Sequence, residues 1–286
     1  MRVFVIGATG FIGGTVARQL ITDENEVVGL CRSDEAAAAL NDQGITPVRG
    51  DLTAPDSIIP SAGSSDATMW IAPRTAEGTI SPSQVIDALR SPDDAFILTT
   101  GTGAYTDTED AVVDESVALS TDRRGTAQSE VESSVLQAPS GRTTVIRPVW
   151  VYGDDITRRG WMRTLIQRAL ELGVSYYPED GGTRRVSTVH VEDLANLYSI
   201  ALEEATPGTL VNAPAEPPVS VLDLAGAVAT AAGIPRKVEP ISADRFIELF
   251  GALGIYQKSM VISRKRASDF GWEPGRKSVL EVLSEG

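Results

Sequence analysis

The sequence of 286 residues contains one cysteine, one histidine and only four lysines. A single cysteine, Cys31, excludes an internal disulfide, which is typical of proteins from a reducing cytoplasm. His190 is the only histidine, and no set of His, Cys and carboxylate residues has the spacing of metal ligands. We therefore predict a cytoplasmic protein without a bound metal.

Positive charge is also scarce, because 39 acidic residues against 25 Lys and Arg give a formal net charge of −14. Such a surface repels phosphate backbones, so we predict no nucleic-acid partner. No apolar run approaches the ~20 residues that a membrane-spanning helix needs. Strand-like residues begin at Arg2, so we expect neither a signal peptide nor a membrane span. We predict a small-molecule substrate, and neither a nucleic-acid nor a membrane partner.

Short β-branched and aromatic runs alternate with helix-like segments along the first half of the chain. Strands are predicted at residues 2–6, 26–30, 46–49, 67–71, 95–100 and 143–147. Helices are predicted from the first glycine turn to residue 21, and at 35–40, 83–89 and 125–136. This alternation predicts an α/β fold with a Rossmann-type doubly wound parallel sheet.

The regular alternation of strands and helices ends near Pro148. Helices are predicted at 161–172, 191–203 and 220–232, with strands at 184–189 and 209–212. We predict a Rossmann domain over residues 1–147 and a smaller C-terminal substrate-binding α+β portion over 148–286, with segments near 187–213 returning to the first domain. The Trp and Phe side chains from Phe246 onward are expected to fill the core of the smaller portion or to line its cleft.

A glycine-rich turn joins the first strand to the first helix, with the sequence Gly7-Ala8-Thr9-Gly10-Phe11-Ile12-Gly13. The first glycine permits the tight turn, the second lets the backbone approach a pyrophosphate, and the third allows close packing of helix on strand. The helix N-terminus adds free N–H groups and the positive end of its dipole. The turn predicts a dinucleotide site; the alternative is a turn without a ligand. The predicted contacts are Gly7, Thr9, Gly10, Phe11, Ile12 and Gly13.

The end of the second strand indicates which nicotinamide cofactor is bound. Sites specific for NAD usually carry an Asp or Glu here, whereas this chain has Arg32 and Ser33, which can bind a 2′-phosphate. We therefore predict NADP(H) rather than NAD(H), with Arg32 as a solvated loop residue in the alternative interpretation. Asp51 and Leu52 follow the third strand, where an adenine can be met. Cys31 is interpreted as a packing residue.

These motifs together resemble the extended and atypical short-chain dehydrogenases/reductases, and more narrowly the NAD-dependent epimerase/dehydratase group. The matching segments are residues 7–14, 50–52, 69–73, 147–154 and 189–195. The resemblance implies that Ala72 and Pro73 lie beside the pyrophosphate and ribose, and that Pro148 and Val151 lie beside the nicotinamide. It also implies Thr99 near the cofactor and a possible homodimer through the helix that carries Gln128.

One departure from that family concerns its catalytic pair. Members usually carry Tyr-x-x-x-Lys on the helix after the fifth strand, and this chain contains no such motif. Alignment on Glu132 puts Gln128 at the position of the Lys and Arg124 at that of the Tyr. Gln128 can still bind the ribose, and Arg124 can bind a carboxylate or a developing oxyanion.

Other residues are candidates for the missing chemistry. The Ser/Thr member of the family's catalytic set corresponds to Thr99 or Thr100, although Gly101 has the closest matching position. Tyr105 is the best surviving candidate acid, with a packing or substrate-contact role as the alternative, and Tyr152 has the same ambiguity. The predicted catalytic residues are Thr100, Tyr105, Arg124 and Gln128.

Three further polar features have interpretations that do not require catalysis. His190 precedes a predicted helix and favours a capping role over catalysis. Asp114 and Glu115 are interpreted as loop anchors. The arginine pairs at 158–159 and 184–185 either meet an anionic substrate or are solvated.

The leading functional hypothesis is an NADP(H)-dependent oxidoreductase of the atypical short-chain type, acting on a carbonyl, imine or enone. The second hypothesis is a nucleotide-sugar epimerase or dehydratase, which the motifs permit and the lost Tyr and Lys oppose. The third is a non-catalytic NADP(H)-binding sensor or scaffold.

Overall fold

The computed structural model describes residues 1–71, 80–89, 91, 93–138, 141–153, 155, 160–215, 217–235, 237–251 and 258–285. Its central sheet has seven parallel strands in the order β11-β6-β5-β4-β1-β2-β3. They are β1 (Arg2–Ile6), β2 (Glu26–Cys31), β3 (Thr46–Arg49), β4 (Ala67–Trp70), β5 (Ala95–Thr99), β6 (Arg142–Pro148) and β11 (Thr209–Ala213). The predicted Rossmann-type parallel sheet is confirmed.

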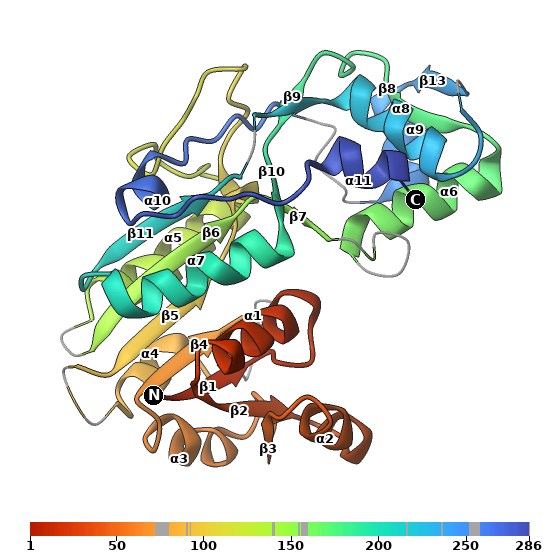
Figure 1. Cartoon of the computed structure of the whole chain (residues 1–286). Coiled ribbons are helices and arrows are strands. Elements are labelled where there is room, and N and C mark those ends of the chain that lie inside the picture. The colour runs from red at the N-terminus through yellow and green to blue at the C-terminus, as the bar shows by residue number, and fades with distance from the viewer. Residues whose placement is uncertain are drawn as a thin grey trace.

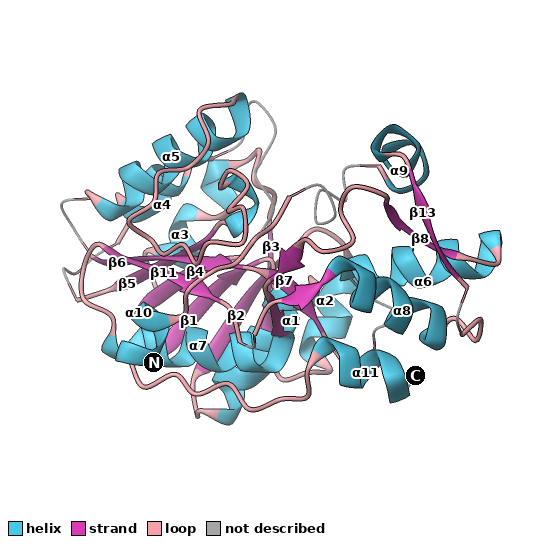
Figure 2. Ribbon diagram, turned by 90° about the horizontal axis from the view of Figure 1, so that it is seen from above, coloured by secondary structure: helices cyan, strands magenta, loops and turns pink. Residues whose placement is uncertain are grey.

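Helices cover both faces of this sheet, because successive side chains of a strand point to opposite faces. Val3 and Val5 belong to one core, and Phe4 and Ile6 belong to the other. The first core includes residues of α1 (Phe11–Thr22), α2 (Asp34–Asn41) and α7 (Val191–Glu204). The second includes Ile58, which follows η1 (Pro55–Ser57), and residues of α3 (Ile59–Ala62), α4 (Pro82–Ile86) and α5 (Arg123–Leu136). Figure 2 shows α3, α4 and α5 on one side of the sheet and α1 and α7 on the other.

The strand order reverses direction between β1 and β4. The chain runs outward through β2 and β3 on one side of β1, and through β4, β5, β6 and β11 on the other. In open α/β sheets, ligands bind outside the carboxyl ends of the strands at this switch point. The glycine turn follows β1, and Ile71 follows β4, so both lie at that point.

A second group of elements lies beside the sheet, at the upper right of Figure 1. Its hydrophobic core is built from α6 (Gly160–Leu172), α8 (Val221–Ala231), α9 (Ala243–Phe250) and α11 (Val279–Glu285). A parallel pair, β8 (Ser175–Pro178) with β13 (Val238–Ile241), packs against it. Phe246 and Phe250 stack in this core with ring centroids 4.3 Å apart, as their sequence position predicts.

The strand predicted at 184–189 is wrong in its continuity. The chain forms two short strands, β9 (Arg185–Val186) and β10 (Thr188–His190), which pair with β12 (Val219–Ser220) and β7 (Trp150–Tyr152) in separate sheets. Ser187 lies between them, donating its N–H to the Met260 carbonyl at 2.9 Å. Two different partners, both distant in sequence, therefore divide a run that the local pattern presents as continuous.

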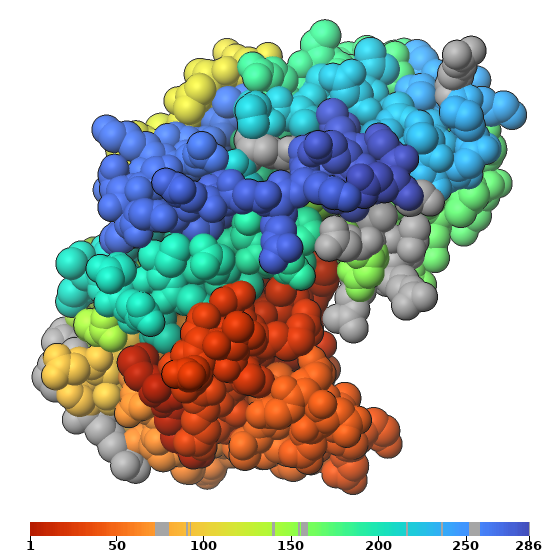
Figure 3. Space-filling model, viewed as in Figure 1, coloured from red at the N-terminus to blue at the C-terminus, as the bar shows by residue number. Residues whose placement is uncertain are grey.

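The C-terminal segment corrects a second expectation, since not every late aromatic side chain belongs to the smaller core. Trp272 is 1% exposed, belongs to the core around α1 and α7, and donates its Nε1–H to the Asp193 carbonyl at 2.9 Å. The segment, with α10 (Lys265–Asp269), lies over α7 before reaching α11, as the blue surface in Figure 3 shows. In the described part of the chain, no helix is long and apolar enough to span a membrane.

Candidate functional site

A pocket of about 490 Å³ opens at the carboxyl ends of β1, β4 and β5. It brings together eight of the residues predicted from sequence, which come from the glycine turn, the end of β5 and the start of α5. Those residues are Gly10, Phe11, Ile12, Gly13, Thr99, Thr100, Arg124 and Gln128. Ile71 and Gly101 complete its lining.

The glycine turn has the close approaches that its pattern requires. Gly7 has a φ of 103°, which L side chains rarely adopt. A Cβ at Gly13 would lie 2.2 Å from the Gly7 carbonyl oxygen, so helix and turn meet at a distance that only glycine allows. Gly10 is the N-cap of α1 and offers no side chain to its first turn. The N–H groups of that turn thus remain available to a phosphate, while Thr9 lies within the turn and does not line the pocket.

The predicted adenosine contacts gather at the carboxyl ends of β2 and β3. Ser33 caps α2 by accepting from the Ala36 N–H at 3.2 Å, and Arg32 is exposed beside it. Asp51 accepts from the Thr53 N–H and hydroxyl, and these bonds, with a smaller effect from Arg32, hold its pKa below the ordinary value. Leu52 packs against the core around α4 and α5. Arg32 therefore lies close to Asp51, outside the pocket lining.

Gln128 is oriented by two hydrogen bonds. Its Nε2 donates to the Gly101 carbonyl at 2.8 Å and to Oε1 of Glu132 at 2.9 Å. Both amide hydrogens have an acceptor, which fixes the assignment of nitrogen and oxygen. Gln128 therefore has only its carbonyl oxygen to offer the pocket, as an acceptor for a ribose hydroxyl, whereas a lysine at this position would be a donor.

Thr100 is held by the same carboxylate. Its hydroxyl donates to Oε1 of Glu132 at 2.6 Å, so the hydroxyl hydrogen points away from a substrate in the pocket. The Thr99 hydroxyl lies 2.5 Å from the hydroxyl of Tyr198 on α7, and burial raises the pKa of Tyr198. Thr100 is therefore not arranged to donate a proton to a bound molecule. Among the side chains that line the pocket, the cationic donor is Arg124.

Glu132 forms a buried ion pair with Arg147, whose side chain is 5% exposed against 3% for that of Glu132. Arg147 donates to both carboxylate oxygens and, through Nη1, to the Tyr105 hydroxyl at 2.6 Å. Burial acts to lower the pKa of Arg147, but the hydrogen bonds and charge of Glu132 raise it above the usual value. The guanidinium therefore remains charged inside the protein.

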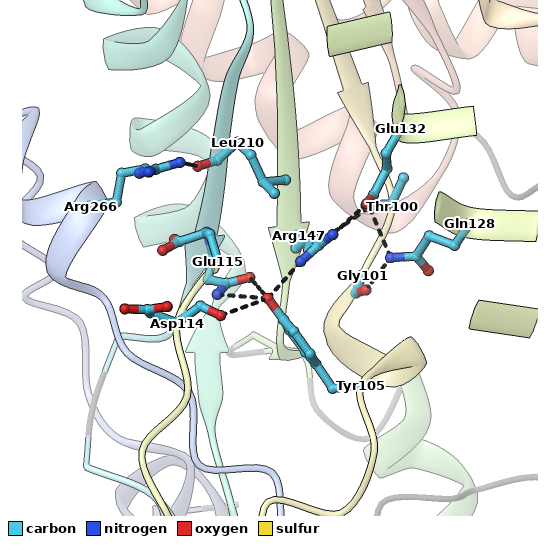
Figure 4. A network of polar contacts seen from close by, with 11 residues as sticks. Thr100, Gly101, Tyr105, Asp114, Glu115, Gln128, Glu132, Arg147, Leu210 and Arg266 are labelled. Carbon is cyan, nitrogen blue, oxygen red and sulfur yellow. Dashed lines mark hydrogen bonds and ion pairs between the residues drawn. The ribbon is translucent and has the colours of Figure 1, made fainter. Parts of the chain in front are cut away.

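The position of Tyr105 corrects the prediction that it is the proton donor. Its side chain is 1% exposed, and its hydroxyl donates to the Asp114 carbonyl at 3.2 Å and accepts from Arg147 and Asn212. Figure 4 shows the hydroxyl pointing into this network, away from Gln128. Burial, opposed by Arg147, raises the pKa of the phenol. Tyr105 thus anchors a loop, which is the alternative interpretation of its sequence position.

The remaining candidates lie at the margin of the site or outside the described residues. Pro148 ends β6, and its carbonyl accepts from Thr102 at 3.4 Å, while the Val151 carbonyl accepts from Trp161 at 2.8 Å. Neither side chain lines the pocket. Ala72, Pro73 and the arginine pair at 158–159 lie outside the described residues.

Several predicted structural roles are confirmed. His190 is the N-cap of α7 and accepts from the Glu192 N–H at 3.2 Å. Glu115 accepts from the Asn212 N–H at 2.7 Å, and Asp114 accepts from Ser116, so both anchor the loop. Cys31 is buried in the core around α1.

Sequence reasoning missed the chemical role of Glu132 and Arg147. A charged residue inside the apolar strand TTVIRP is a signal that a buried partner exists. That signal does not identify the partner, because many acidic residues are available. The sequence also gave no sign that Lys258 lies at the turn after β5, where its ammonium donates to the Gly103 carbonyl.

A protein-family model described as NAD(P)H-binding matches residues 7–169, which is more than half of the chain. An uncharacterised protein of Schizosaccharomyces pombe is 29% identical over 311 residues, covering 99% of this chain and 98% of the relative. An uncharacterised protein of Saccharomyces cerevisiae is 27% identical over 304 residues, with 99% and 98% covered. The similarity therefore extends over nearly the whole length of both fungal proteins.

Solved structures share the fold. A human epimerase family protein, SDR39U1, in a structure with NADPH, superposes with a TM-score of 0.73 at 21% identity, covering 100% of this chain and 98% of that one. Thermus thermophilus UDP-glucose 4-epimerase, in a complex with NAD, gives a TM-score of 0.75 at 19% identity, with 99% and 97% covered. With the family model spanning the glycine turn and the end of β6, the chain belongs to the NAD(P)H-binding family.

Proposed function

We propose that this protein is an NADP(H)-dependent oxidoreductase of the atypical short-chain type, which transfers hydride between the nicotinamide and a small organic substrate. The observation that carries the proposal is the shared pocket of about 490 Å³, in which the glycine turn faces Thr99, Thr100, Arg124 and Gln128. A dinucleotide whose pyrophosphate lies on the turn can extend along this wall.

The choice of NADP(H) over NAD(H) rests on the carboxyl end of β2. Arg32 is exposed there, and the residue after it, Ser33, carries a hydroxyl rather than a carboxylate. A guanidinium binds a 2′-phosphate through charge-assisted hydrogen bonds, whereas an acidic residue at this place would repel it. Asp51 lies nearby, and Thr53 holds its carboxylate in place. We propose that this carboxylate contacts the adenine.

The nature of the substrate follows from which donors line the pocket. Gln128 and Thr100 already donate their hydrogens to Gly101 and Glu132. They can therefore only accept hydrogen bonds from a bound molecule. Arg124 can stabilise negative charge on an oxygen, but its guanidinium is a poor proton donor. We therefore propose substrates that need little help from an enzymic acid, such as an activated carbonyl, a protonated imine or an enone. The smaller group of elements around α6 and α8 would contribute the rest of the substrate site.

The proposal is tested first by cofactor binding and then by turnover. Titration of the purified protein with NADPH and NADH, followed by nucleotide fluorescence, should give tighter binding of NADPH. A panel of ketones, imines and enones should then include at least one that oxidises bound NADPH, measured by loss of absorbance. Tight NADPH binding with no turnover in any class would overturn the oxidoreductase and favour a sensor. Co-purification of tightly bound NAD would favour an epimerase instead.

A further inference from the structure

The hydroxyl groups of Thr99 and Tyr198 meet at the carboxyl end of β5, 2.5 Å apart. Thr99 ends β5, is partly exposed and lines the pocket, whereas Tyr198 lies on α7 and is 0% exposed. Within the described part of the chain, this contact is the one hydrogen bond that either hydroxyl makes. Each hydroxyl carries one hydrogen, and only one of the two can lie between the oxygens. The other hydrogen must therefore point elsewhere.

The burial of Tyr198 decides which of the two hydroxyls donates. If Thr99 donated, the Tyr198 hydrogen would lie in the core around α1 and α7, where no other described group accepts it. A buried donor without an acceptor destabilises the folded protein, whereas a hydrogen at the pocket can bind water or a ligand. Burial also raises the pKa of Tyr198, so the phenol keeps its hydrogen at neutral pH. Tyr198 is therefore the donor and Thr99 the acceptor.

The position of Thr99 in the sheet indicates which part of a dinucleotide its hydrogen can meet. The strand order places β2 on one side of β1, and β4 and then β5 on the other. Two strand spacings separate β1 from β5, which is about 10 Å. A dinucleotide with its adenosine beside Arg32 after β2 and its pyrophosphate at the glycine turn after β1 extends towards β5. Its nicotinamide half therefore reaches Thr99.

We propose that Tyr198 is a positioning residue that donates to Thr99 and so directs the Thr99 hydroxyl hydrogen into the pocket, onto an oxygen of the cofactor's nicotinamide riboside. The inference rests on the proposed function, which it deepens by assigning a donor to the nicotinamide half of the cofactor. Thr100 and Gln128 present only acceptors to the pocket, and Arg124 presents a charge. Thr99 thus supplies a neutral donor that those three side chains do not.

Two substitutions of nearly unchanged shape test the pair. Thr99→Val removes the hydroxyl at the pocket, and Tyr198→Phe removes only the phenol oxygen. Thr99→Ser keeps a hydroxyl at the same position, so it should bind the cofactor like the wild type and separate the role of the hydroxyl from that of packing. Tyr176→Phe is the matched control, because Tyr176 is partly buried on β8 among the smaller group of elements and does not line the pocket.

The probes are NADPH and 2′,5′-ADP, which has the adenosine and the 2′-phosphate but no nicotinamide riboside, and isothermal titration calorimetry measures both affinities. Thr99→Val should weaken NADPH roughly threefold to tenfold, the loss of one neutral hydrogen bond, and leave 2′,5′-ADP unchanged. Tyr198→Phe should also weaken NADPH selectively, because the Thr99 hydroxyl is then free to turn. With the bond reversed, Tyr198→Phe would instead release the Thr99 hydrogen, and NADPH binding would stay equal or become tighter.

Three results would overturn the proposal. They are wild-type NADPH affinity in Thr99→Val, equal losses of NADPH and 2′,5′-ADP in that variant, and NADPH binding in Tyr198→Phe at least as tight as in the wild type. Each of them leaves the proposed function standing if the wild type binds NADPH and oxidises it. A wild type that binds NADPH no more tightly than 2′,5′-ADP would refute the proposed cofactor and this inference together.

Discussion

Replacement of Glu132 by Gln tests the buried network at its centre. The carboxylate accepts from Thr100, from Gln128 and, through both oxygens, from Arg147, and the ion pair is almost completely buried. The substitution preserves volume but removes the charge and turns one acceptor into a donor. Arg147 then keeps a buried positive charge without an anionic partner.

The expected loss of stability follows from that unpaired charge. Breaking a buried ion pair by removing one partner costs about 3–5 kcal/mol. For a chain of this size, each kcal/mol lowers the melting temperature by about 2–4 °C, so Glu132→Gln should melt roughly 10 °C below the wild type. The NADPH affinity should fall as well, because the oxygen that orients the Gln128 amide is also held by Arg147 and shifts when that ion pair is broken.

Differential scanning calorimetry measures the first effect, and titration with NADPH measures the second. Glu130→Gln is the matched control, because Glu130 is exposed on the same helix, and a surface change of this kind stays within about 0.5 kcal/mol. The double variant Glu132→Gln/Arg147→Met should recover part of the lost stability, since it removes the stranded charge. A Glu132→Gln protein that melts like the control, or a double variant that is less stable than the single one, would refute the reasoning.

Three further substitutions test other parts of the structure. Gly13→Ala should abolish NADPH binding and destabilise the fold, because its Cβ would meet the Gly7 carbonyl oxygen at 2.2 Å, whereas Gly226→Ala on α8, where nothing lies within 4 Å, should be tolerated in both thermal melts and titration. Arg32→Glu should weaken NADPH roughly tenfold or more while leaving NADH nearly unchanged; equal losses for both cofactors would show that Arg32 does not bind the 2′-phosphate. Asp122 caps α5 and its pKa is lowered chiefly by the Gly125 N–H, so its stabilisation exists above the ordinary value of 3.8 and disappears as the pH falls through the folded pKa. Melting temperatures of the wild type and Asp122→Ala should therefore differ most near neutral pH and converge in acid, and a constant difference would contradict the capping role.

The predictions that succeeded depend on residues close together in the chain. The strand–turn–helix pattern from Arg2 to Ile21 specifies a parallel sheet and its glycine turn, because each element is set by its own apolar period. The cap at His190 is visible in the sequence, since the residue directly precedes an amphipathic helix. The burial of Cys31 is predictable too, because this residue ends an apolar strand.

The predictions that failed depend on distant partners. Tyr105 follows shortly after the strand that ends at the pocket, yet its hydroxyl contacts Arg147 and Asn212, which lie 42 and 107 residues further along the chain. The strand predicted at 184–189 divides because its two halves, β9 and β10, pair with β12 and β7, which come from distant parts of the chain. Trp272 joins the core of the sheet because the C-terminal segment crosses α7.

The sequence by itself determined the sheet, the glycine turn and the absence of a Tyr-x-x-x-Lys pair, because these are properties of local pattern and residue type. The tertiary structure decided the hydrogen bonds and the burial of the polar side chains at and near the pocket. It turned Gln128 into an acceptor by binding its amide to Glu132, buried Tyr105, and brought Lys258 within 3.2 Å of the Gly103 carbonyl over a separation of 155 residues. Hydrogen bonds and charge pairs of this kind depend on which segments pack together in space, and the local sequence around each residue carries no record of its partner.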